Sequence, residues 1–214
     1  MATTSDPALV SRTTPVQARG LARVDALLDA AAEIVDTAGV VGMTTSAIAE
    51  RSGSSVGAVY RYFPNADAVL IALAARNRER FMQRVSETFA EQQPADWMAF
   101  SRMCVDVYAA LGSDTPGFRV VRFGDVVSMR FANQEASNNE QLAQQLDDVL
   151  LERYGFEGTQ ALLFATQVAM ECADALTRRA FLRETAGDER FLIAAKELII
   201  GILALHAPEA PVGG

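Results

Sequence analysis

The segment 53–62 of this chain holds residue types that suit the binding of a phosphate-bearing polymer. It starts with small residues, which let the backbone approach a phosphate group and donate free amides to it. These residues are Gly53, Ser54, Ser55 and Gly57. Tyr60 and Tyr62 can donate from their phenols to phosphate oxygens, and Arg61 adds a positive charge. Val56 can contact a thymine methyl group, so the pattern indicates recognition of duplex DNA rather than catalysis.

The same stretch also matches G-x-S-x-G, the motif in which α/β-hydrolases hold a nucleophilic serine, here Ser55. His206, the single histidine, lies downstream in the chain order that those enzymes use. Such a serine must follow a buried strand, whereas residues 48–52 have a helical pattern and no series of parallel strands is visible. A serine hydrolase is kept as a remote alternative, and we predict that the protein is not an enzyme.

Composition restricts the function further. One histidine and two cysteines, Cys104 and Cys172, without a CxxC pair, argue against a zinc site and a disulfide scaffold, so we predict no metal and no cofactor. Although 50% of the residues are hydrophobic, no run approaches the roughly 18 residues of a membrane span, and residues 1–20 lack a signal-peptide core. We expect a globular, cytoplasmic protein with no membrane contact.

The elements that position segment 53–62 are helices. Apolar residues recur at steps of three and four from about Ala18 to Ala38, and Gly39 and Gly42 permit turns after this helix. Thr44 or Thr45 can cap a second helix over 46–52, and after the turn at Gly53 a third covers 56–63 up to Pro64. Two short helices joined by a tight turn and braced by a preceding helix form a helix-turn-helix, with residues 55–62 as the recognition helix.

The remainder of the chain keeps the helical period. A long helix starts near Asp67 and runs to Pro94, and further helices are predicted over 97–111, 118–131, about 142–154, 157–184 and 188–206. The segment 118–131 is rich in valine, which also suits strands, but no segment shows a sustained period of two. The chain is therefore predicted to be all-α with about nine helices, divided into an arm (1–17), a helix-turn-helix domain (18–65), a helical domain (66–206) and a frayed tail (207–214).

The motif runs Thr44-Thr45-Ser46-Ala47-Ile48-Ala49, then Ser52-Gly53-Ser54-Ser55, then Gly57-Ala58-Val59-Tyr60-Arg61-Tyr62-Phe63-Pro64, followed by Asp67. With this spacing, residues 20–70 resemble the TetR family of transcriptional regulators. The resemblance implies a ligand-responsive regulator, most often a repressor, that binds a palindromic operator as a homodimer. It also raises Thr44 and Thr45 from helix caps to candidates for phosphate contact, and it implies an effector cavity in the second domain.

Two positions depart from the family pattern. Ala66 stands where a lysine commonly pairs with phosphate, and Ser54 stands where a hydrophobic residue is common. Residues 1–80 carry eight arginines against eight acids, whereas residues 81–214 carry 11 basic and 19 acidic residues, so the net charge of −8 arises after residue 80. Weak non-specific DNA affinity is therefore expected, with Arg12 and Arg19 as possible arm contacts. A helical ligand-binding or scaffolding protein without an operator is the alternative.

Large apolar side chains of the second domain are candidates for lining a cavity for a small, largely apolar effector, although ordinary core packing is the competing interpretation for each. The candidates are Trp97, Phe100, Met103, Cys104, Tyr108, Phe123 and Phe164. Polar residues that would orient a ligand if they point inward include Ser101, Asp106 and Gln167. The last two helices combine a stripe of small residues with an apolar arc too wide for a surface helix, which predicts a subunit interface. The candidates for this interface are Ala165, Ala169, Cys172, Leu176, Leu198 and Ile202.

Overall fold

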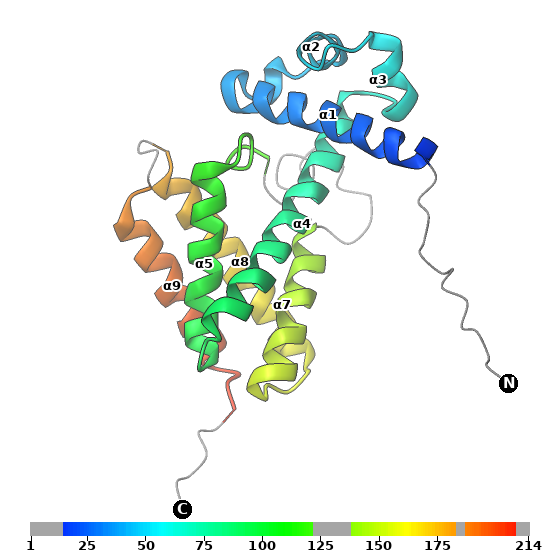
Figure 1. Cartoon of the computed structure of the whole chain (residues 1–214). Helices are drawn as coiled ribbons and strands as arrows, with labels where there is room; N and C mark the ends of the chain where they lie inside the picture. The colour runs from blue at the N-terminus through cyan, green and yellow to red at the C-terminus, as the bar shows by residue number, and fades with distance from the viewer. Residues whose placement is uncertain (1–14, 122–137, 183–186, 209–214) are drawn as a thin grey trace, which may run out of the picture.

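The computed structural model describes residues 15–121, 138–182 and 187–208, and all regular structure within these ranges is helical. The helices are α1 (Pro15–Ala38), the 3-10 helix η1 (Val40–Gly42), α2 (Thr45–Arg51), α3 (Val56–Tyr62), α4 (Ala66–Gln92), α5 (Trp97–Asp114), α7 (Asn138–Tyr154), α8 (Gln160–Ala180) and α9 (Glu189–Leu203). The predicted all-α fold is confirmed. An N-terminal head (α1, η1, α2 and α3) sits above a helical body (α5, α7, α8 and α9), and α4 runs from one into the other (Figure 1).

The head folds around one apolar core because each of its helices contributes one buried row of side chains. Val35 on α1, Ile48 on α2 and Val59 on α3 are fully buried in this core. The connection after α1 is short because Gly39 adopts a positive φ of 68°, which glycine does without strain. The three helices pack around a core of 17 buried apolar residues, to which α4 and Val121 also contribute.

The long helix α4 connects the head to the body. Its N-cap is Asn65, whose Oδ1 accepts a hydrogen bond from the amide of Ala68 at 2.8 Å. The prediction that Asp67 lies at the start of this helix is confirmed, because the helix begins at Ala66 and Asp67 is the acidic residue of its first turn. Val69 and Leu73 near the start of α4 belong to the head core, whereas Phe81 and Val85 belong to a second core in the body. Helix α4 therefore contributes side chains to both cores.

The body packs α5, α7, α8 and α9 around this second core, with α8 and α9 side by side over most of their length (Figure 1). Edge-to-face aromatic pairs hold its interior, including Phe81 against Tyr108 at 6.1 Å and Tyr108 against Phe118 at 5.4 Å between ring centroids. Lys196 on α9 and Asp106 on α5 form an ion pair of 2.5 Å at the edge of this packing. The core is thus centred on α5.

Residues 115–121, here called the bridging segment, join the two cores. Phe118 is fully buried in the body core, and Val121, three residues later, is buried in the head core. Asn77 of α4 donates a hydrogen bond to the carbonyl oxygen of Val121, and the amide of Gly117 donates to Asp36 Oδ1 of α1 at 3.2 Å. The segment thereby contacts the head and the body at the same time.

Several predicted helix bounds were wrong by a few residues. Helix α1 begins at Pro15 rather than Ala18, and α5 continues to Asp114, beyond its predicted end at residue 111. Gly112 therefore lies inside α5, where a Cβ would be 3.5 Å from the ring of Phe181. Helices α8 and α9 end at Ala180 and Leu203, before the predicted residues 184 and 206. Of the predicted helix 118–131, residues 118–120 form a turn, and residues 122–131 lie outside the described ranges.

Candidate nucleic-acid interface and ligand cavities

The turn between α2 and α3 is fixed by local hydrogen bonds. Gly53 adopts a φ of 63°, and the amide of Ser54 donates to the carbonyl oxygen of Ala49 at 2.8 Å. The hydroxyl of Ser52 donates to the hydroxyl oxygen of Ser54 at 2.7 Å. Ser54, which stands where the family commonly has a hydrophobic residue, thus contributes a side-chain hydrogen bond to the turn.

Two of the predicted DNA-binding hydroxyls are helix caps. Thr44 Oγ1 accepts a hydrogen bond from the amide of Ala47 at 3.1 Å, and Ser55 Oγ accepts one from the amide of Ala58 at 3.2 Å. Because Ser55 follows helix α2 and a turn, and not a strand, the structure contradicts its alternative role as a hydrolase nucleophile. The caps leave the first amides of α3 without an intrahelical partner, as at every helix start, and Gly57 has open space before it.

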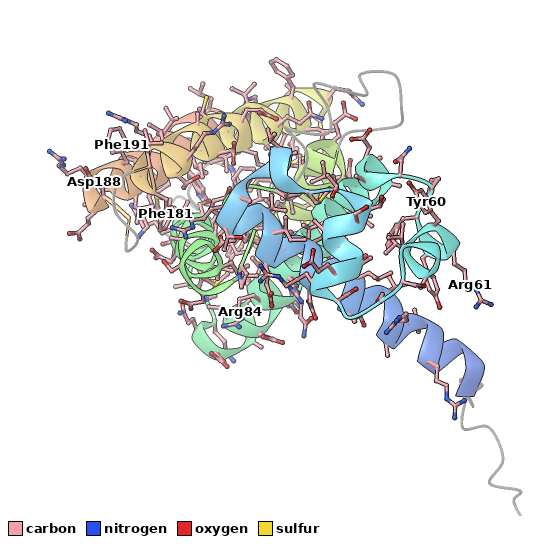
Figure 2. All side chains as sticks on the ribbon, turned by 90° about the horizontal axis from the view of Figure 1, so that it is seen from above. Tyr60, Arg61, Arg84, Phe181, Asp188 and Phe191 are labelled. Atoms are coloured by element: carbon pink, nitrogen blue, oxygen red, sulfur yellow. The ribbon has the colours of Figure 1, made fainter. Side chains whose placement is uncertain are left out.

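The outward side of α3 presents most of the predicted contact residues together. Val56 is 40% exposed and Tyr60 is 54% exposed, and Arg61 and Tyr62 are also exposed. Tyr60 and Arg61 lie at the outer edge of the head, away from the body (Figure 2). The hydroxyl of half-buried Thr45 lies 3.4 Å from the phenolic oxygen of Tyr60, which links the start of α2 to α3.

Helix α3 and its C-cap carry four large apolar or aromatic side chains at helical spacing, which are Val56, Val59, Tyr60 and Phe63. The structure divides them, because Val59 and Phe63 are buried in the head core while Val56 and Tyr60 form the neighbouring, exposed row. Tyr60 is thus about half covered by the head, and the rest of its ring is available at the surface. Of the possible arm contacts, Arg19 is exposed on α1, and Arg12 lies outside the described residues.

Two small apolar cavities lie inside the body, with volumes of about 70 and 50 Å³. They share four lining residues, which are Cys104, Leu146, Met170 and Ile199. Burial raises the pKa of the Cys104 thiol to about 12, so this side chain stays neutral. The polar group at the larger cavity is Asp174, which accepts a hydrogen bond from the phenol of Tyr108 at 2.8 Å.

The predicted cavity residues are placed as follows. Cys104 and Tyr108 line the larger apolar cavity, and Phe100 and Cys104 line the smaller one. Trp97 packs edge-to-face on Phe156 at 5.6 Å, and Met103 is buried in the body core. Gln167 is half-buried away from the cavities described here, and Phe123 lies outside the described residues.

Phe164 does not line a cavity, because α8 directs it outward and leaves it 67% exposed. Of the polar residues considered for orienting a ligand, Ser101 donates its hydroxyl to the carbonyl oxygen of Trp97, and Asp106 pairs with Lys196 at the surface. Sequence reasoning missed Asp174. Its position between Met170 and Thr177 on one row of α8 was the available signal.

A third and wider cleft of about 290 Å³ lies where the head meets the body. It is lined by one residue of α1, two of α5, three of the bridging segment and four around the end of α8. These are Asp36, Tyr108, Gly112, Phe118, Arg119, Val120, Thr177, Arg178, Phe181 and Leu182. Tyr108 and Thr177 also line the larger apolar cavity, so the cleft and that cavity adjoin. No local sequence pattern signals this cleft, because its walls come from distant parts of the chain.

Helices α8 and α9 and the turn after α9 expose several large apolar side chains. Phe164, Ile193, Leu198 and Leu205 are 67%, 50%, 38% and 84% exposed. Of the predicted interface residues, Leu198 is exposed and Cys172, Leu176 and Ile202 are half-buried. Ala165 and Ala169 are buried, at 7% and 2% exposure, because the small-residue row of α8 faces the body core instead. Their assignment to a subunit interface is therefore wrong.

Within ranges 15–121, 138–182 and 187–208, no helix combines the length and apolarity that crossing a membrane requires. The same ranges contain no cluster of three side chains able to hold a metal ion.

A braced helix-turn-helix with an exposed recognition helix, joined by one long helix to a body containing apolar cavities, defines a DNA-binding regulator of the helix-turn-helix class. Residues 27–73 match the model of "Bacterial regulatory proteins, tetR family", and residues 95–207 match "Tetracyclin repressor-like, C-terminal domain". The second match alone covers more than half of the chain. The protein belongs to the TetR family of transcriptional regulators.

Individual relatives agree with this assignment. A TetR-family transcriptional regulator from Streptomyces coelicolor is 31% identical, with a TM-score of 0.73 over 87% of this chain and 98% of that one. The fatty acid degradation regulator FadR from Bacillus halodurans shares the fold at 19% identity and a TM-score of 0.62, over 87% and 97% of the two chains. An uncharacterised HTH-type regulator from Xanthobacter autotrophicus is 34% identical over 73 residues, which span 34% of each protein.

Proposed function

We propose that the protein is a ligand-responsive repressor that binds a palindromic operator as a homodimer. The observation that carries this proposal is the division of α3 into a buried row, Val59 and Phe63, and an exposed row that presents Val56 and Tyr60 beside Arg61. The buried row orients the helix rigidly on the head core, and the exposed row has the shape and donors to enter a major groove.

A dimer is supported by the exposed apolar surface of α8, α9 and the turn after α9, where Phe164, Leu198 and Leu205 are 67%, 38% and 84% exposed. A two-fold axis through this face would bring together two copies of the same surface, as in isologous dimers. It would also present two recognition helices, which must lie about 34–36 Å apart to enter successive major grooves on one side of the duplex.

Release from the operator requires that a ligand favour a conformation in which the two heads no longer match this spacing. Helix α4 supports this proposal because it contributes to the head core at Val69 and to the body core at Phe81. A ligand that displaces α4 in the body would also displace the head. Operator affinity would then fall at most by the factor by which the ligand binds the displaced conformation more tightly than the DNA-binding conformation.

Selection of DNA from a random duplex library at defined salt tests the proposal. We expect an inverted repeat, and Gly57→Glu and Tyr60→Ala should abolish its selection. In the first variant a charge repelled by phosphate fills the open space at the helix start, and in the second the exposed phenol is lost. A library without any preferred sequence refutes operator binding and leaves the alternative, a ligand-binding protein without an operator.

The contribution of Arg61 can be measured separately. Arg61→Gln should lower the slope of log K against log salt concentration by about one, as expected for one lost phosphate contact. Arg102→Gln is the matched control, because Arg102 is also exposed but lies on α5 and pairs with Glu197 at 3.5 Å. Equal slopes for both variants would exclude Arg61 as a phosphate contact.

The dimer face is tested by Leu198→Glu. Leu198 and Ile71 of α4 are equally exposed, at 38%, so Ile71→Glu introduces the same charge at a surface outside the proposed interface. Light scattering during size-exclusion chromatography should show monomers for Leu198→Glu and dimers for wild type and Ile71→Glu. A dimeric Leu198→Glu variant would place the interface elsewhere.

A further inference from the structure

The cleft between the head and the body is the widest of the cavities described above. Its volume of about 290 Å³ is about twice that of the engineered apolar cavities of roughly 150 Å³ that bind benzene. The two apolar cavities, at about 70 and 50 Å³, are smaller than those cavities. A ligand with a ring or a short chain and a polar group therefore fits the cleft in the described conformation, and would have to enlarge the apolar cavities before it could enter them.

One side of the cleft is apolar. Phe118 of the bridging segment, Phe181 after α8 and Gly112 of α5 contribute to it. A Cβ at Gly112 would lie 3.5 Å from the ring of Phe181, so the absence of a side chain there keeps this wall open. Phe181 lies at the same end of the α8–α9 pair as Asp188 and Phe191, on the far side of the molecule from Tyr60 and Arg61 (Figure 2).

The other side carries charge. The guanidinium of Arg119 has one ionic partner among the described residues, Asp36 of α1, at 4.0 Å, which is beyond hydrogen-bond distance. Most of its five N–H donors therefore remain for another acceptor. A second guanidinium, Arg178, borders the cleft and pairs with Asp174 at 2.9 Å. Asp36 instead directs Oδ1 to the amide of Gly117 at 3.2 Å.

We propose that this cleft binds an organic carboxylate with a small apolar body, whose carboxylate pairs with Arg119 and whose body lies against Phe118 and Phe181. The donors of Arg119 match a carboxylate in charge and in bidentate geometry. A neutral amide would lose the charge, and an amine would meet two guanidinium groups. The proposal extends the effector binding proposed above to a site at the junction between the head and the body.

Binding there affects the head directly. The carboxylate of the ligand takes the place of Asp36 opposite Arg119, and it brings a second negative charge close to Asp36. Asp36 belongs to α1, which carries the head, and its bond to Gly117 ties the head to the bridging segment. The ligand therefore weakens a contact that holds the head against the body. This consequence rests on the proposed function, whereas the binding itself does not.

Calorimetric titration of the full chain in the absence of DNA tests the site. The probes are phenylacetate, 4-phenylbutyrate and octanoate, each compared with its neutral amide, and with phenethylamine as a cation. We expect at least one carboxylate to bind at least tenfold more tightly than its amide and than phenethylamine. Arg119→Gln should remove this preference, whereas Arg102→Gln, which removes a partly exposed arginine of α5 that pairs with Glu197 of α9, should preserve it.

Two further variants separate binding from a general structural effect. Asp36→Asn retains an oxygen for the amide of Gly117 but removes the competing charge, so carboxylate affinity should rise several-fold. Gly112→Ala narrows the apolar wall without a clash, because its nearest neighbour is 3.5 Å away, and it should weaken the phenyl probes more than octanoate.

The proposal is overturned if no carboxylate binds, if amides bind equally well, or if Arg119→Gln leaves the affinities unchanged. Selection of operator DNA is a separate measurement, so a failure there removes the proposed function and leaves the carboxylate site in place. Conversely, an operator that is found together with probes that do not bind removes only this site.

Discussion

Gly117 is the residue of the bridging segment that packs against helix α1 of the head. Replacing it with alanine tests that contact. Its φ is 72°, and an added Cβ would lie 2.8 Å from the carbonyl oxygen of Ala32 and 3.0 Å from its Cα. Both atoms belong to the backbone of α1 and cannot rotate away. Gly155, at the end of α7, provides a matched control, because its φ is also 72° but its Cβ would meet nothing within 4 Å.

The two substitutions share one energetic cost and differ in another. A left-handed backbone costs a non-glycine residue about 1–2 kcal/mol, which applies to both variants. Overlap with a packed backbone adds about 1–3 kcal/mol at Gly117 alone. Gly117→Ala should therefore destabilise the protein by about 2–5 kcal/mol and Gly155→Ala by about 1–2 kcal/mol, out of a total of about 5–15 kcal/mol for a typical domain.

Urea unfolding provides the measurement, followed by the fluorescence of Trp97, the single tryptophan, and by far-UV circular dichroism. The informative quantity is the difference in unfolding free energy between the two variants, because the shared backbone cost cancels. A difference below the measurement error would show that the backbone of α1 is not in close contact with Gly117. The contact by which the bridging segment is proposed to connect the body to the head would then be incorrect.

Two titratable groups in the body give further expectations. Burial raises the pKa of Cys104 to about 12, so alkylation at pH 8 should modify half-buried Cys172 and spare Cys104 until the chain unfolds; peptide mass spectrometry that finds Cys104 labelled first would contradict this. Burial also raises the pKa of Asp147, which accepts a hydrogen bond from Thr166 at 2.7 Å, so the folded state binds this proton more tightly than the unfolded state. Its stabilisation is complete below the unfolded pKa of about 3.9 and is lost as the pH rises through the folded pKa. Asp147→Asn should therefore gain stability relative to wild type between pH 4 and pH 7 in urea unfolding; exposed Asp148→Asn should gain less, because it removes only the neighbouring charge that contributes to the raised pKa of Asp147.

The helices and the motif could be predicted from the sequence because their causes are local. Apolar spacing, the cap at Thr44 and the turn at Gly53 act within a few residues, and each has the predicted role in the structure. The cap at Ser55 is equally local but was not predicted. The cap of α4 was not predicted, and Asn65, two residues before Asp67, takes this position in the structure. The class of protein follows from these local features together.

Tertiary packing alone decided which side of each helix is covered. A helical period places Phe164 and Ala165 on adjacent rows of α8 without stating which row faces the core, and the packing of α8 in the body buries the alanine and exposes the phenylalanine. Asp36, Arg119 and Arg178 meet at one cleft only because the bridging segment crosses from one core to the other. The rotation of a helix about its own axis depends on neighbours far away in the chain, so no local pattern specifies it.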